Sequence, residues 1–336
     1  MKKAVFTTTI PMEVVFAAGF KPIDLNNEFI TCDSPISHLE KAETDGLPGS
    51  SCAWIKGLYS VLLEKTFTND DVFIAVTEGD CSNARVLEEI ISSKTGVRSF
   101  LFNFPNDRDR SKLENEISRF AKFLGTDIKK AEIVRNELQQ TRDKLFEIDE
   151  MTYKFPGFIT GAKNHELLVN TSDFGGNYHN YDKMLENFLN DRKEHLKNYE
   201  NTGRKKIGFL GVPPIIPVYD FIEERNATIV FNEIQKEFAM LGNYENIVDQ
   251  YLNYTYTYSS GFRFNKTIPE IKKRNLDGII HYVQSFCHRQ LEDIILRKML
   301  KDRGINIPVL TLEADKPGAQ IDSRLATRIE AFLEML

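Results

Sequence analysis

Three cysteines stand where the sequence pattern changes from a strand into a helix. Cys52 follows a Pro-Gly-Ser-Ser turn and opens a helical run, Cys81 follows an apolar run of strand type, and Cys287 lies between another such run and an amphipathic segment. Ligands of open α/β sheets bind at the carboxyl ends of the strands. The placement therefore favours one thiolate cluster, and burial of each cysteine as a small apolar side chain is the alternative.

The spacing of these cysteines matches no short metal-binding motif. They lie far apart, so the sequence contains no CxxC pair of the zinc or ferredoxin type. Cys32 lies in a polar loop, where the roles of ligand, pocket wall and spectator are all open. His288 follows Cys287 directly, and it could tune a metal cluster, move a proton or simply pack at the edge of a sheet.

Other polar positions have ordinary structural explanations. Glu13 follows Pro11, as acids do in the first turn of a helix, and a role in a pocket is the alternative. His165 and His179 flank a Gly-Gly loop and could be surface residues. The GxxGxPP turn at 208–214 lacks the order of a phosphate-binding loop, and its prolines remove amide donors, so we expect a tight strand-to-helix turn.

Length, composition and charge limit the classes of protein to which the chain can belong. The chain has 336 residues, enough for two domains, and its 41% hydrophobic and 27% charged residues are typical of a globular protein. A net charge of −6 gives no electrostatic reason to expect nucleic acid, and no apolar run is long enough for a membrane span. Residues 1–22 do not fit a signal peptide. We therefore expect a cytoplasmic protein with reduced cysteines rather than disulfides.

The pattern of apolar runs divides the chain into three segments. Residues 1–108 alternate short strands and helices, residues 109–203 carry long charged helices that suggest a connector, and residues 204–336 alternate again. This alternation predicts an α/β fold with two Rossmann-like parallel-sheet domains. Residues 251–258 are rich in tyrosine, and we expect them at the surface as an interface or a solvated loop.

Four stretches together resemble the 2-hydroxyacyl-CoA dehydratase and benzoyl-CoA reductase family, over nearly the whole chain. They are Pro11-x-Glu13-x-x-x-Ala17-Ala18-Gly19, Ser51-Cys52-Ala53-Trp54, Asp277-Gly278 ahead of Cys287, and Leu312-Glu313-x-Asp315 followed by TRIEAFLE at 327–334. The resemblance implies two flavodoxin-like domains bridged by helices. It also implies a [4Fe-4S] cluster in the cleft between them, held by Cys52, Cys81 and Cys287, with the fourth iron open to water, a thiol or substrate.

The resemblance also implies an activity and partners. Family members are iron–sulfur lyases or reductases of acyl-CoA substrates in anaerobic metabolism, working as dimers with a homologous subunit. A separate ATP-dependent iron–sulfur activator supplies an electron, and the thioester becomes a ketyl radical that expels the hydroxyl group. In this setting Ser51, Asp80 and His288 are candidates for hydrogen bonds to the cluster, His288 and Glu13 are candidate catalytic residues, and a homodimer or a heterodimer is expected.

Departures from the family pattern leave alternatives open. Ala53 stands where the family often has proline, and cysteines beyond the proposed three are few, which favours a single cubane. A double-cubane [8Fe-9S] cluster would need Cys32 or a partner chain. The chain could instead be a cluster-carrying electron-transfer subunit, or a cluster-free module that binds small molecules and buries its cysteines.

Overall fold

A computed structural model describes residues 1–318 and 320–336, which form two compact units built from discontinuous stretches of chain. Unit 1 comprises Met1–Arg142, Asn170–Lys183 and Gly242–Ser259. Unit 2 comprises Asp143–Val169, Met184–Leu241 and Ser260–Leu336. Each unit contains a four-stranded sheet in which every strand pair is parallel, so the predicted α/β fold with two flavodoxin-like domains is confirmed.

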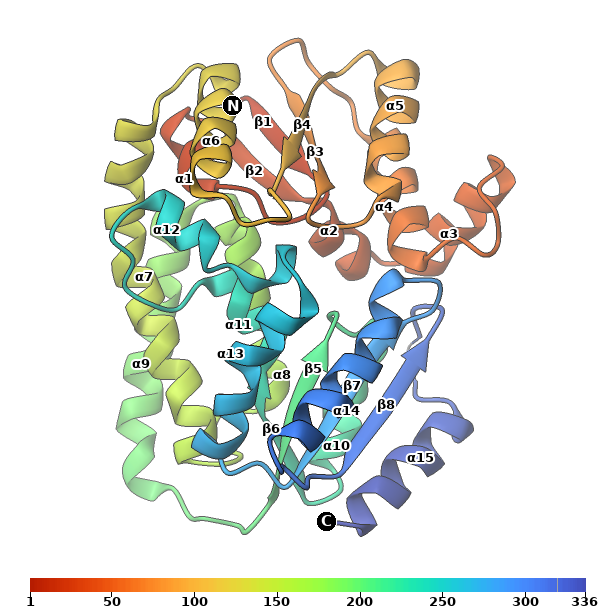
Figure 1. Cartoon of the computed structure of the whole chain (residues 1–336), viewed down its shortest axis with the longest axis vertical. Coiled ribbons are helices and arrows are strands. Elements are labelled where there is room, and N and C mark those ends of the chain that lie inside the picture. Colours follow the sequence, from red (N-terminus) through yellow and green to blue (C-terminus); the bar gives the residue numbers. More distant parts are fainter. Residues whose placement is uncertain (319) are drawn as a thin grey trace. The chain divides into compact units, whose positions relative to one another are not determined.

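The sheet of unit 1 has the strand order β2-β1-β3-β4 (Figure 1). Its strands are β1 (Lys3–Phe6), β2 (Lys21–Asp24), β3 (Val72–Glu78) and β4 (Arg98–Asn103). Its helices are α1 (Met12–Ala17), α2 (Leu25–Thr31), α3 (Pro35–Thr44), α4 (Ala53–Glu64), α5 (Asn83–Thr95) and α6 (Arg110–Leu124). Helices α1 and α6 lie on one side of the sheet and α4 and α5 on the other, as the crossover rule for parallel strands requires.

Local sequence explains where the helices of unit 1 begin and end. Asp109 caps α6 by accepting a hydrogen bond from the backbone amide of Lys112. Gly96 and Gly125 end α5 and α6 in the left-handed conformation that glycine adopts without steric cost. The apolar stretch of β3 is buried on both faces, because a parallel sheet is covered by helices on both sides.

The sheet of unit 2 repeats the same topology with the order β6-β5-β7-β8. Its strands are β5 (Lys205–Gly211), β6 (Ala227–Asn232), β7 (Gly278–Gln284) and β8 (Val309–Ala314). Its helices include α8 (Gly161–Val169), α10 (Val218–Glu223), α11 (Glu233–Ala239), α13 (Ser260–Lys273), α14 (Glu292–Asp302) and α15 (Ser323–Glu334). One face of the sheet packs against α13 and α14 through Phe264, Ile268 and Leu296, and on the other face Phe209 stacks near Tyr219 of α10.

Residues 109–203 are helical, as expected, and they contribute to both units. The long helices are α7 (Ile128–Lys154) and α9 (Tyr178–His195), and the short 3-10 turns are η1 (Asn170–Ser172), η2 (Phe174–Gly176) and η3 (Leu196–Asn198). Arg142, within α7, is the last residue of the first stretch of unit 1. Among the described residues, no helix combines the length and the apolar character needed to cross a bilayer.

The expected exposure of residues 251–258 is wrong. This segment follows α12 (Ile247–Leu252), includes the 3-10 turn η4 (Thr255–Thr257), and buries Tyr251, Tyr254, Tyr256 and Tyr258. Phe104 lies against the rings of Tyr251, Tyr254 and Tyr258. The tyrosines therefore belong to the interior of unit 1 and leave no tyrosine-rich surface for a partner.

Gly211, at the carboxyl end of β5, is required by a close approach of backbone. Its φ is 94°, and a Cβ added there would lie 2.1 Å from the carbonyl oxygen of Tyr282. We predict that Gly211→Ala lowers the free energy of unfolding by about 2–4 kcal/mol, through steric strain and an unfavourable left-handed backbone. Urea unfolding measures this, with Gly261→Ala as the control because a Cβ at Gly261 meets no atom within 4 Å. Equal unfolding midpoints for the two variants would contradict the close approach.

Candidate functional site

Cys81 lies at the carboxyl edge of the first sheet, three residues after Glu78 ends β3. The chain turns there at Gly79, whose φ is 92° and whose Cα packs against Phe104 and Thr257, with no room for a side chain. Helix α5 begins two residues after Cys81, at Asn83. The thiol therefore sits in a strand-to-helix turn at the edge where α/β sheets bind ligands, as the sequence predicted.

Cys52 occupies the N-cap position of α4 in the same unit. The turn before it is held by the buried Lys56, whose ammonium group donates to the carbonyl oxygen of Gly49 at 2.9 Å and to the Glu43 carboxylate at 2.6 Å. Sequence reasoning missed this lysine, and its signal was a lysine one turn into an otherwise apolar helix. Lys56 thereby fixes the entry to α4 and the position of the Cys52 thiol.

The thiol of Cys52 lies close enough to Cys81 to influence the ionisation of Cys81. Burial raises the pKa of Cys81 to about 11, and the charges of Asp80 and then of Cys52 act in the same direction. Burial is also the main cause that raises the pKa of Cys52. Hydrogen bonds from the backbone amides of Ile55 and Trp54 lower this pKa, and the charge of Asp80 raises it further. The charge of Asp80 therefore acts on both thiols, and both thiols are protonated at neutral pH when no metal is bound.

Cys287 belongs to unit 2 and takes the corresponding place in the second sheet. It lies three residues after Gln284 ends β7, as Cys81 lies three residues after the end of β3, and β7 and β3 are the third strands of their sheets. The preceding residue, Phe286, has a φ of 65°, so the chain turns sharply here too. The two sheets thus each present a cysteine at the same topological position.

The loop that carries Cys287 is anchored on both sides. The hydroxyl of Ser285 donates to the Glu313 carboxylate of β8 at 2.7 Å, and the amide of Cys287 donates to the carbonyl of Gln284 at 3.1 Å. Beyond it, Arg289 forms an ion pair with Glu292 at 3.0 Å. Glu292 also pairs with the fully buried Arg263, which pairs with Glu233 at the start of α11. This network fixes the turn after β7.

The remaining predicted residues fall at separate places. Ser51 directly precedes Cys52, and His288 begins the short 3-10 turn η5 (His288–Leu291) beside Cys287. Cys32 follows the last residue of α2, and its thiol donates to the carbonyl oxygen of Phe29 at 3.1 Å. Cys52, Cys81 and Asp80 are therefore brought together within unit 1, whereas Cys287 and His288 lie together in unit 2.

Glu13 is fully buried inside unit 1 and is surrounded by partners. Its carboxylate accepts hydrogen bonds from Arg142 at 2.6 Å, Gln250 at 2.7 Å and the hydroxyl of Tyr251 at 2.8 Å. Burial alone would raise the pKa of Glu13, but the charge of Arg142 and the hydrogen bond from Gln250 hold it below its ordinary value. Glu13 is thus an ionised centre that joins three segments of the chain.

The model of the family described as 2-hydroxyglutaryl-CoA dehydratase, D-component, matches residues 7–336. The chain belongs to this family. The resemblance carried by the four sequence stretches is thereby confirmed, and the protein is a subunit of the dehydratase type. No curated protein matches the chain.

The cysteine thiols of this D-component family member would suit iron once they are deprotonated. Among residues 1–318 and 320–336, no group of three or more His, Cys, Asp or Glu side chains is arranged to hold a metal ion. Unit 1 offers the two neighbouring thiols of Cys52 and Cys81, and unit 2 offers Cys287 at the matching turn. The chemistry of these donors fits an iron–sulfur group.

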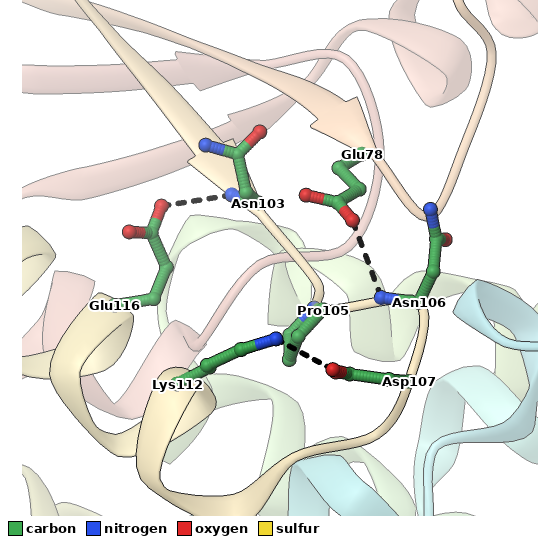
Figure 2. Close-up of a pocket in the computed structure, with 7 residues that line it drawn as sticks. All are labelled: Glu78, Asn103, Pro105, Asn106, Asp107, Lys112 and Glu116. Atoms are coloured by element: carbon green, nitrogen blue, oxygen red, sulfur yellow. Dashed lines mark hydrogen bonds and ion pairs between the residues drawn. The ribbon is translucent and has the colours of Figure 1, made fainter.

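A pocket of about 350 Å³ lies where β3 and β4 end, between Glu78 and the turn that follows β4 (Figure 2). Glu78 in the pocket accepts a hydrogen bond from the backbone amide of Asn106 at 3.3 Å, and Lys112 pairs with Asp107 at 2.5 Å. Three carboxylates and one ammonium group give the lining a net negative charge. The sequence signal was the polar turn after β4. The lining residues are Glu78, Asn103, Pro105, Asn106, Asp107, Lys112 and Glu116.

Asp80→Asn is expected to make Cys81 more reactive in the iron-free, reduced protein. The charge of Asp80 contributes to the raised pKa of Cys81, so its removal increases the fraction of thiolate, which is the nucleophile. We predict alkylation of Cys81 by iodoacetamide at mildly alkaline pH to become several-fold faster, as followed by peptide mass spectrometry. Asp70→Asn removes an exposed carboxylate elsewhere and serves as the control. An unchanged rate in Asp80→Asn would show that this carboxylate does not face the thiol.

Proposed function

We propose that this dehydratase-family subunit carries a [4Fe-4S] cluster on Cys52, Cys81 and Cys287 and acts on an acyl-CoA-type substrate. The observation that carries the proposal is the proximity of Cys52 to Cys81, which follows β3 at the carboxyl edge of the first sheet, with the charge of Asp80 acting on both thiols. Cys287, at the equivalent turn of the second sheet, supplies the third thiolate in this proposal. Three cysteine ligands leave one iron open to another ligand.

When bound, such a cluster would supply a low-potential electron for radical dehydration or reduction of the thioester. The residues of the chain have simpler tasks. Lys56 and Gly79 fix the turns that hold Cys52 and Cys81, and the Arg263–Glu292–Arg289 network fixes the turn at Cys287. Hydrogen bonds from Ser51 or His288 to the sulfurs would tune the cluster. The negative charge of Asp80 would disfavour a more negatively charged, reduced state of the cluster.

The proposal includes partners and a location. Membership of a D-component family implies work alongside other subunits, and we propose a homologous subunit in a homodimer or heterodimer together with a separate ATP-dependent iron–sulfur activator. A reducing cytoplasm would keep the cysteines available for iron. A single cubane is proposed over a double cubane, because Cys32 is the one cysteine of the sequence beyond the three proposed ligands.

One observation favours a second function, that of an electron-transfer subunit that binds no substrate. The pocket at the ends of β3 and β4 is lined by the carboxylates of Glu78, Asp107 and Glu116, with Lys112 as the one cation in its lining. This lining would repel the phosphates of coenzyme A. A cluster-carrying subunit whose partner binds the thioester would have no need of a site for these phosphates. Binding of coenzyme A to the isolated chain separates the two functions, since only the first requires it.

Iron content tests the ligand assignment directly. We predict about four iron and four sulfide ions per wild-type chain after anaerobic purification. Each of Cys52→Ser, Cys81→Ser and Cys287→Ser should lose most of this iron together with the brown colour. Cys32→Ser is the matched control and should keep a full complement. A Cys287→Ser protein with undiminished iron and sulfide would remove unit 2 from the site and overturn the assignment.

A further inference from the structure

His165, on α8 of unit 2, is held from one side by a buried polar network. Its Nδ1 lies 3.0 Å from the hydroxyl of Tyr219 on α10 and 2.9 Å from the amide nitrogen of Gln235 on α11. The residue is half-buried, and no hydrogen bond to Nε2 is found among the described residues. One ring nitrogen is thus anchored inside while the other remains available.

The direction of each hydrogen bond in this network follows from the amide of Asn232. Its Nδ2 donates to the carbonyl oxygen of Gly161 at 3.0 Å and to Oδ1 of Asn164 at 2.8 Å, so both amide hydrogens have acceptors. Oδ1 of Asn232 consequently faces the hydroxyl of Tyr219 at 2.8 Å and must accept its hydrogen. The orientation of a single buried amide thereby fixes the phenol.

The tautomer of His165 then follows from the hydroxyl of Tyr219. A phenol has one hydrogen, and that hydrogen goes to Asn232, so the phenol oxygen can only accept from His165. Nδ1 must therefore carry the ring hydrogen, and Nε2 keeps a bare lone pair. The Gln235 nitrogen, 2.9 Å from Nδ1, would instead require Nδ1 to accept a hydrogen bond. We assign the Gln235 amide the opposite orientation, because its oxygen has no partner within the described residues and in that orientation gives Nδ1–H a second acceptor.

The imidazole is also neutral at physiological pH. Burial lowers the pKa of His165 to about 4, and burial raises the pKa of Tyr219 well above its ordinary value. The network therefore contains no charge that would change the tautomer between mildly acidic and neutral pH. A neutral imidazole with a fixed Nδ1–H offers a permanent acceptor at Nε2.

We propose that His165 is a ligand-binding group whose Nε2 accepts a hydrogen bond from an O–H or N–H group of the substrate. Asn232 ends β6 and Gln235 lies in the first turn of α11, so the network occupies the carboxyl edge of the second sheet. Cys287 follows β7, two strands along the same sheet, which corresponds to roughly 10 Å between strands. The identity of the ligand rests on the proposed function: a 2-hydroxyacyl hydroxyl or a pantetheine amide would provide the hydrogen.

Nitrogen-15 NMR of protein labelled at its histidines tests the tautomer without the cluster or any activity. The signals of His165 are identified by their loss in His165→Gln. In the iron-free protein, we expect Nδ1 to carry the hydrogen and Nε2 to show the shift of an unprotonated nitrogen from about pH 5 to about pH 8. Because this readout needs no iron, it is independent of the experiment that tests the cluster.

Two small molecules distinguish which chemical group donates the hydrogen bond to Nε2 of His165. Coenzyme A offers pantetheine amides, and lactate offers a 2-hydroxyl group beside a carboxylate. We expect at least one of them, at high millimolar concentration, to move the Nε2 resonance of His165 by several parts per million. An Nε2–H tautomer in the free protein, or an unmoved His165 resonance with both probes, overturns the inference.

Tyr219→Phe tests the hydrogen-bond chain, since it removes the acceptor for Nδ1–H. We expect the population of the Nε2–H tautomer to rise and the response to the probe to fall several-fold. Tyr153→Phe is the matched control, because the Tyr153 hydroxyl bonds to Glu150 on α7 and takes no part in the network. If Tyr219→Phe does not fold, the tautomer of the wild-type protein and its response to the two probes still decide the proposal.

Discussion

The buried carboxylate of Glu13 is the interaction on which unit 1 depends. The unit is assembled from three stretches of chain, and Glu13 in α1 bonds to Arg142 at the end of the first stretch and to Gln250 and Tyr251 in the third. An ionised carboxylate without partners would be very costly in such a place, because burial disfavours charge. Residues 242–259 cannot move away without removing two of the three hydrogen-bond partners of that buried carboxylate, which ties them to the first sheet and sets the packing of Phe104 against Tyr251.

The repeated topology of the two sheets explains why the reactive residues stand where they do. In both units the third strand runs into a turn of three residues that ends in a cysteine, and a helical segment follows. The turns are held by different means. In unit 1 a glycine with positive φ packs against Phe104 and Thr257, whereas in unit 2 the non-glycine Phe286 adopts a positive φ and the ion pairs around Glu292 hold the loop. A left-handed Phe286 is strained, and such strain persists only where the surroundings enforce it.

Local pattern was enough to predict the strands and the turns after them, because strands buried on both faces appear as apolar runs and the cysteine turns are polar. The short helices α2 and α3 were not expected, since their sequences are polar and bury few side chains. The tyrosines at 251–258 were wrongly placed at the surface because Asn and Thr alternate with them. The roles of Glu13 and His165 could not be predicted, because Gln250, Tyr219 and Gln235 lie far from them in sequence and only the fold brings them together.

The electrostatics of the thiol pair bear on what the site can hold. In the iron-free protein, burial and the carboxylate of Asp80 both favour the protonated thiols of Cys52 and Cys81, so neither is a strong nucleophile at neutral pH. Binding of a metal must therefore release protons, and affinity should rise with pH. A cation between the sulfurs would reverse the sign of the interaction with Asp80, from repulsion of thiolates to attraction of the metal. The same carboxylate that suppresses the empty site's reactivity would then stabilise the occupied one.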